Sequence, residues 1–111
     1  MWLLDANMDV HLISVFRDLQ ITCDTAGQRG WKTLSNGQLV RAAVDAGFEC
    51  LLTRDQLFGE SASQALKQFP KFAVVVVNVR QRPWAEYREE FLAYWKLRPI
   101  EPVAGKLIQW P

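Results

Sequence analysis

Polar side chains that could bind a metal ion or a phosphate follow each of four short apolar runs in the sequence. They are Asp5 and Asn7, Asp24, Asp55 with Thr53 and Arg54 just before it, and Asn78 with Arg80. Carboxylate and amide oxygens are ligands that Mg²⁺ and Mn²⁺ prefer. Since carboxylates that share a site repel each other unless a cation joins them, Asp5 and Asp55 predict a divalent-ion site. Such an ion can activate water and stabilise charge on a phosphate.

The same acids have a purely structural interpretation. An aspartate or asparagine at the end of a strand often caps the helix that follows it. Asp5, Asn7 or Asp9 could cap the first helix, and Asp55 could stabilise its own turn. Each acid alone favours a cap, whereas several of them at one sheet edge favour a site. His11 is the only histidine, and it either lines that site or packs at the surface.

The apolar runs predict strands, and the segments between them predict helices. Strands are expected at residues 2–4, 21–23, 48–53 and 72–79, with two short ones at 100–103 and 106–110. Helices are expected at residues 8–19, 35–46, 61–67 and 83–95. This alternation predicts an α/β fold, a three-layer α/β/α sandwich with a mostly parallel sheet. In such sheets ligands bind outside the carboxyl ends of the strands.

Two local signals support this pattern. Ser35 and Gln38 have the spacing of a capping box at a helix start. The run Phe72–Val79 is apolar without alternation, so both of its faces should be covered, as in a parallel sheet. The chain has neither a glycine-rich dinucleotide fingerprint after its first strand nor a phosphate-binding loop motif.

Length and composition limit the class of protein. The 111 residues form one predicted domain, residues 1–111, and the formal net charge of +1 does not mark a dedicated nucleic-acid binder. Cys23 and Cys50 have no metal-binding spacing, and we expect both to be reduced core residues. No leader peptide is recognisable and no apolar run is long enough to cross a membrane. We therefore expect a cytoplasmic protein without membrane contact.

Basic and aromatic side chains alternate late in the chain. They are Arg80, Arg82, Arg88, Lys96 and Arg98, with Trp84, Tyr87, Tyr94 and Trp95. One interpretation is an amphipathic helix that packs its aromatic stripe on the core and leaves its charges in solvent. Others are a groove for nucleic acid, or, with Trp110, an interface with a partner or in a homodimer.

Three segments together resemble a known family. Leu3-Leu4-Asp5-Ala6-Asn7 resembles the opening Leu-Leu-Asp-Glu-Asn of the short PIN-like proteins, a domain of unknown function in the PIN nuclease clan, presumed toxins of prokaryotic toxin–antitoxin loci. Residues 34–43 resemble its Ser-Asp-x-x-(Leu/Ile) helix start. Residues 51–59 resemble its Leu-Leu-Thr-x-Asp-x-Asp-Phe-Gly block. The match covers about the first 80 residues and is loose in the C-terminal third.

The resemblance implies a PIN-like fold and an Mg²⁺- or Mn²⁺-dependent ribonuclease held by a cognate antitoxin. Asp5 and Asp55 would then be both catalytic residues and metal ligands. Contacts to RNA or its phosphate would come from Asn7, Asn36, Thr53, Arg54 and Arg80.

The chain departs from the family at two acidic positions. Asn36 and Leu57 stand where the pattern has carboxylates, and fewer charged ligands lower the affinity for a hard cation. Glu60 either substitutes for a missing acid or is a solvated helix-start residue. The alternative to a nuclease is therefore a catalytically silent PIN-like module that binds a protein or RNA.

Overall fold

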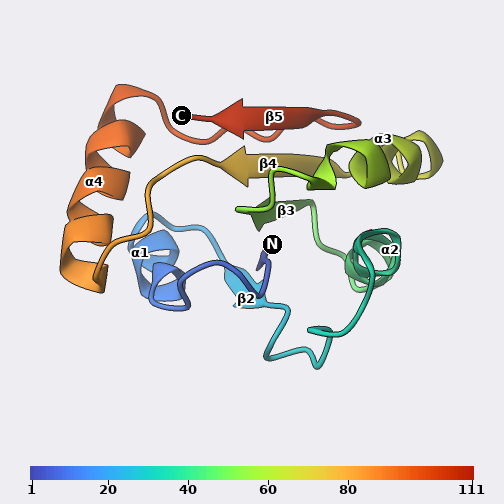
Figure 1. Ribbon diagram of the computed structural model, residues 1–111, viewed down its shortest axis with the longest axis horizontal. Helices are drawn as coiled ribbons and strands as arrows, with labels where there is room; N and C mark the ends of the chain where they lie inside the picture. Colours follow the sequence, from blue (N-terminus) through green and yellow to red (C-terminus); the bar gives the residue numbers. More distant parts are fainter.

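The computed structural model describes residues 1–58 and 61–111, in which strands and helices alternate along the chain (Figure 1). The strands are β1 (Trp2–Leu4), β2 (Cys23–Thr25), β3 (Cys50–Thr53), β4 (Ala73–Val77) and β5 (Leu107–Trp110). The helices are α1 (Leu12–Asp18), α2 (Asn36–Asp45), α3 (Phe58–Gln68) and α4 (Trp84–Leu97). In this described part of the chain, every helix is too short or too polar to span a lipid bilayer.

All five described strands lie parallel in one sheet, in the order β2-β1-β3-β4-β5. Every residue of β3 and β4 is buried, as the run without alternation predicts for strands covered on both faces. Because the strands are parallel, their carboxyl ends meet at one edge of the sheet. The predicted α/β/α sandwich is confirmed.

Alternate residues of the strands face two separate helix layers. Leu4 and Leu52 pack with α1 and α4, whereas Leu3 and Leu51 pack with α2 and α3. Figure 1 shows the same division, with α1 and α4 on the left of the sheet and α2 and α3 on the right. The period of two along each strand therefore fills both interfaces.

The start of α2 forms as predicted. The Ser35 hydroxyl accepts the Gln38 backbone N–H at 3.4 Å, and Gln38 Oε1 accepts the Ser35 N–H at 3.0 Å. Each side chain therefore satisfies a donor that the first helical turn leaves unpaired. Gly47 follows α2 with a positive φ of 89°, a conformation that glycine adopts without steric cost.

The aromatic side chains of α4 form a continuous ladder in the core. Tyr87 stacks on Trp84, Phe91 on Tyr87, and Trp95 on Phe91, with ring centroids 6.1–6.2 Å apart. Trp110 of β5 lies 5.0 Å from Phe91. Tyr87, Phe91 and Trp110 are buried and Trp84 and Trp95 are half-buried. The core-packing interpretation of these aromatics is confirmed.

Some predicted element boundaries are wrong. The second strand is residues 23–25 instead of 21–23, because Thr25 pairs with Leu4 while Ile21 precedes the pairing. The first helix begins at Leu12, since residues 8–11 are not helical, and α3 begins at Phe58.

No strand forms at residues 100–103, where Pro102 has no N–H to donate to a ladder. Gly105 then turns the chain into β5 with a φ of 76°. A Cβ atom at this position would lie only 2.9 Å from the Pro70 carbonyl oxygen. The backbone approach at this turn therefore requires glycine.

Both cysteines are free thiols. Cys50 is buried in β3, and burial raises the pKa of its thiol far above the ordinary value. Cys23 is half-buried at the start of β2, where burial, with a smaller contribution from the Asp24 carboxylate, raises its pKa to about 11. The expectation of reduced cysteines is confirmed, with Cys23 only partly in the core.

The raised pKa values predict slow alkylation of the folded protein. Because the thiolate is the nucleophile, iodoacetamide should label neither cysteine appreciably at pH 7.5, and both rapidly in urea. The alkylation rate of Cys23 should increase as the pH rises toward 11, and that of Cys50 should increase only at a higher pH. Peptide mapping by mass spectrometry measures both rates. Labelling of the folded chain as fast as a free peptide thiol would contradict this account.

Phe16 is the residue of α1 on which the α1/α4 interface depends. It is fully buried, and its ring lies 5.4 Å from Trp2, 5.7 Å from Phe91 and 5.8 Å from Trp95, edge to face in each case. Phe16→Ala should lower the free energy of unfolding by about 3–5 kcal/mol. Exposed Arg17 on the same helix is the control, and Arg17→Ala should change it by less than about 0.5 kcal/mol. Urea denaturation followed by circular dichroism measures the free energy of unfolding of both variants. A similar loss of stability in the two variants would contradict the packing role of Phe16.

Candidate functional site

The buried hydroxyl of Thr53, the last residue of β3, joins the two predicted catalytic acids. It donates to Asp5 Oδ2 at 2.7 Å and accepts the backbone N–H of Asp55 at 3.1 Å. Asn7 Nδ2 also donates to the Thr53 hydroxyl oxygen, at 3.3 Å. One donor and two acceptor positions are all that a hydroxyl offers. Thr53 is thus saturated, and it positions Asp5 instead of being open to a phosphate.

The strand register brings Asp5 to Thr53. Leu4 of β1 pairs with Leu52 of β3, and the Asp5 N–H donates to the Leu52 carbonyl at 2.9 Å. The chain leaves β1 toward β2 on one side of it and returns in β3 on the other. This reversal is the point at which open parallel sheets bind ligands. The site therefore lies at the most favourable place the topology provides.

Asn7 holds the loop after β1 against the loop after β3. Besides donating to Thr53, its side-chain oxygen accepts the Arg54 backbone N–H at 3.1 Å. Both ends of the amide are engaged, so Asn7 acts here as a clamp that is itself exposed to solvent.

Further amide contacts extend the site along the sheet edge. The Arg54 guanidinium donates to the side-chain oxygen of Gln81, in the loop after β4. Gln56 donates to Asn78 Oδ1, and Asn78 Nδ2 donates to Gln109 Oε1 at 2.8 Å. The loops after β3 and β4 are therefore tied to each other and to β5.

The acids at this edge have different partners. Asp5 Oδ1 accepts the Ala6 N–H at 2.7 Å, and Asp55 Oδ1 accepts the Leu57 N–H at 2.9 Å. Asp55 therefore stabilises its own turn, as its structural interpretation predicts, while lying in the site. Asp24 is paired with Arg29, with 2.7 Å between Oδ2 and Nε.

Asn36, predicted to contact the substrate, lies elsewhere. It lines a polar groove between α2 and α3, together with Ser35, Arg41 and Gln64, and within residues 1–58 and 61–111 no hydrogen bond joins it to Asp5 or Asp55. The Leu57 side chain is 86% exposed, and Glu60 lies outside the described residues. Among those described, no three His, Cys, Asp or Glu side chains are grouped to hold a metal.

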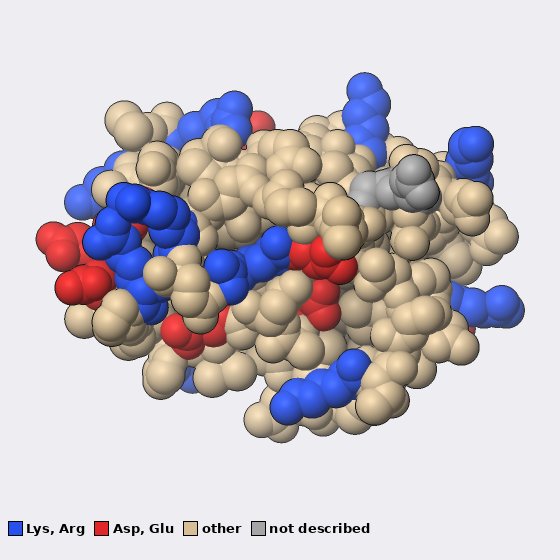
Figure 2. All heavy atoms as spheres, viewed as in Figure 1, with Lys and Arg blue, Asp and Glu red and all other residues tan. Residues whose placement is uncertain are grey.

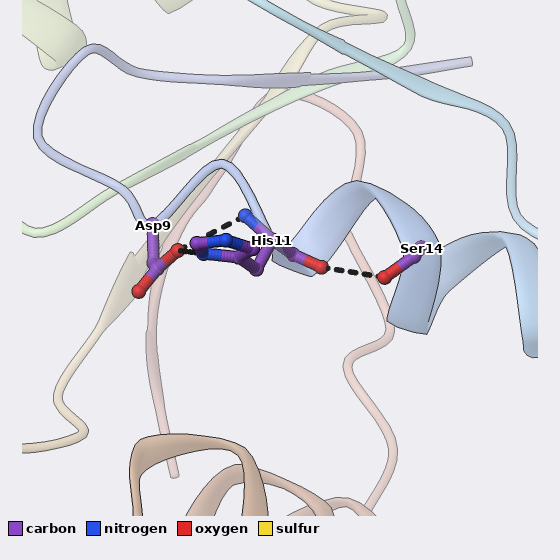
Figure 3. Close-up of polar contacts among 3 residues, drawn as sticks. All are labelled: Asp9, His11 and Ser14. Atoms are coloured by element: carbon purple, nitrogen blue, oxygen red, sulfur yellow. Dashed lines mark hydrogen bonds and ion pairs between the residues drawn. The ribbon is translucent and has the colours of Figure 1, made fainter. Parts of the chain in front are cut away.

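The structure adds an aspartate–histidine pair to the predicted residues (Figure 3). Asp9 Oδ1 lies 2.7 Å from His11 Nδ1 and accepts the His11 backbone N–H at 2.9 Å. A carboxylate only accepts, which assigns the proton to Nδ1. The Ser14 hydroxyl donates to the His11 carbonyl at 2.9 Å, so these three residues form no catalytic triad.

The His11 ring stacks on Trp84 at the start of α4, with 5.1 Å between centroids and 29° between planes. From the sequence, Asp9 is only a possible helix cap, and His11 either lines the site or packs at the surface. Their contact with Trp84, far along the chain, gives no local signal. Beneath Trp84, Tyr87 has a buried hydroxyl for which the described residues supply no hydrogen-bond partner.

Charged groups near Tyr87 affect the pKa of its hydroxyl. Burial raises the pKa of its hydroxyl to about 12; the Arg54 guanidinium opposes the shift, and the Asp9 and Glu90 carboxylates add to it. Arg54 and Asp9 are thus close enough to the same phenol to act on it. The loops after β1 and β3 therefore both bring a charged group near the buried Tyr87 hydroxyl.

The Thr53 contacts predict a loss of local order when the hydroxyl is removed. Thr53→Val keeps the shape but removes the hydrogen bonds of the Asp5 carboxylate and the Asp55 N–H, which are partly buried, and this should cost about 1–3 kcal/mol of stability. Exchange of the Asp55 amide hydrogen, measured by NMR, should accelerate. Thr53→Ser retains the hydroxyl and should keep that amide protected. Equal protection in the valine variant would show that the hydroxyl does not organise the site.

Comparison of the chain with protein-family models, with curated proteins and with solved structures found no match. The likeness to the short PIN-like proteins therefore rests on the sequence segments that carry it.

Proposed function

We propose that this chain is a divalent-metal-dependent phosphodiesterase acting on RNA, with Asp5 and Asp55 as cation ligands. The observation that carries the proposal is that the Thr53 hydroxyl bonds to the Asp5 carboxylate and to the Asp55 backbone N–H, at the strand-order reversal between β1 and β3. The resemblance to the PIN-like proteins supplies the substrate class. It also supplies the expected setting, a toxin held by a cognate antitoxin.

Two carboxylates fit a cation that arrives with its substrate. Mg²⁺ usually retains several waters and is held by one or two carboxylates together with substrate phosphates. Since the described residues contain no third acidic or imidazole ligand in the group, a tightly held resident ion does not fit. A divalent ion bound here would neutralise phosphate charge and acidify a water molecule.

The chain's own residues would orient the substrate around that position. Thr53 fixes one oxygen of Asp5, and Asn7 holds the β1 and β3 loops together. Arg54 reaches along the edge to Gln81, where its remaining N–H groups can meet a phosphate. Arg80 is exposed, with 4.0 Å between its Nε and Glu90 Oε1, and offers a second guanidinium.

A second candidate is a silent module that binds RNA or a protein without cleaving it. The observation in its favour is that neither Asn36 nor Leu57 adds a ligand to the described site, because one lies in the α2/α3 groove and the other is an exposed leucine. Since fold alone does not establish activity, measurement decides between the two.

Cleavage of a labelled RNA in Mn²⁺ tests the proposal against Asp5→Asn and Asp55→Asn. Each substitution should reduce the rate by more than the roughly 10–100-fold that loss of an outer-shell partner costs. Asp45→Asn, on the exposed end of α2, is the matched control and should cleave like the native chain. Calorimetry should show weak Mn²⁺ binding that RNA tightens.

Either of two results would overturn the nuclease. Cleavage unchanged by Asp5→Asn would assign the activity to another site or to a contaminant. RNA binding by the native chain, without cleavage at any Mn²⁺ concentration, would establish the silent module instead.

A further inference from the structure

The loop between β4 and α4 gathers three arginines. Arg54 reaches Gln81 from the end of β3, and Arg80 and Arg82 flank Gln81 in the chain. Arg80 and Arg82 are both held through Nε by the Glu90 carboxylate, at 4.0 and 3.2 Å. Figure 2 shows Lys and Arg side chains gathered over the left of this face, where Figure 1 places α4, with acidic side chains beside them.

These contacts leave donors available for an anion. A guanidinium has five N–H groups in a planar fork, and each contact described uses one side of it. Glu90 is engaged by two arginines and Asp9 by His11, so these two acids are already paired. Such a cluster suits the bidentate binding of phosphate oxygens.

His11 forms a flat, fixed surface at the start of α4, where the loop that carries Arg80 and Arg82 ends. Trp84 covers one face of its ring, Asp9 fixes its Nδ1 edge, and the side chain is 61% exposed. Trp84 follows Arg82 by two residues, which places the ring and the guanidiniums at the same end of α4. Because the ring is already immobilised, a planar ligand stacking on its open face would lose little further side-chain entropy in the protein.

We propose that the seam between α1 and α4 binds one nucleotide of a single-stranded nucleic acid. Its base stacks on the open face of His11, and its phosphate contacts Arg54, Arg80 and Arg82. Aromatic plates beside cationic grooves are the usual means of holding unpaired strands, and a base within a duplex cannot present its face to such a plate. The inference deepens the proposed function by specifying an unpaired substrate, and it requires no cation.

Fluorescence anisotropy of a labelled hexanucleotide in EDTA tests the site with the full chain. His11→Ala should weaken binding of single-stranded RNA by about tenfold, the loss of one base–aromatic contact, whereas His11→Phe should retain most of the affinity. On an abasic strand of the same length, the alanine variant and the native chain should bind equally. Arg82→Gln should weaken both strands and reduce the salt-dependence slope by about one. Arg41→Gln, on α2, should leave binding unchanged.

The outcomes separate this inference from the nuclease. Native affinity in His11→Ala would overturn the stacking site, as would equal native affinity for duplex and single strand. Equal binding of RNA and DNA hexamers would support a site that reads only base and phosphate; preference for RNA would support it with an added contact to the 2′-hydroxyl. RNA binding that depends on His11, without cleavage in Mn²⁺, would support this site and reject the nuclease. Cleavage that Asp5→Asn abolishes, with RNA binding that His11→Ala leaves unchanged, would support the nuclease and reject this site.

Discussion

The hydroxyl of Thr53 is the contact around which the edge of the sheet is organised. One buried oxygen links the end of β3 to the Asp5 carboxylate, the Asn7 amide and the backbone of Asp55. Inside a protein an unpaired polar group is costly, and here every position on the oxygen is used. The loops after β1 and β3 consequently have little freedom to separate, so the positions of Asp5 and Asp55 are restricted as well.

The neighbouring seam achieves rigidity by a different means. There, stacked rings run from His11 through Trp84 and Tyr87 into the buried part of α4. Polar saturation orders the acid site and aromatic packing orders the His11 surface. Arg54 links the acid site to the loop that precedes α4, because its backbone bonds to Asn7 and its side chain to Gln81.

Most of the fold could be predicted from local patterns. The apolar run at β4 and the capping box of Ser35 with Gln38 each correspond to what forms, since the physics that decides them lies within a few residues. The errors have two kinds of cause. The β2 boundary is non-local, because it depends on which residue pairs with Leu4. The missing strand at residues 100–103 is local, because Pro102 has no N–H to donate to a ladder. In the site, the sequence predicts Asp5 and Thr53 at the same edge of the sheet, because the carboxyl ends of parallel strands meet there. The stacking of His11 on Trp84 depends on how α4 packs against α1, and the spacing of residues in the sequence does not reveal that packing.

The position of β1 has a consequence for the order of assembly. The first strand of the chain is an interior strand of the sheet, with β2 on one side and β3 on the other. Its neighbour β3 is distant in sequence, and the bond from Thr53 to Asp5 spans 48 residues. Loops of this length must close before the contacts they bring are formed, which slows folding of parallel sheets. During synthesis, the acid site cannot form until the chain has emerged past residue 55, and the His11 surface cannot form until it has emerged past Trp84.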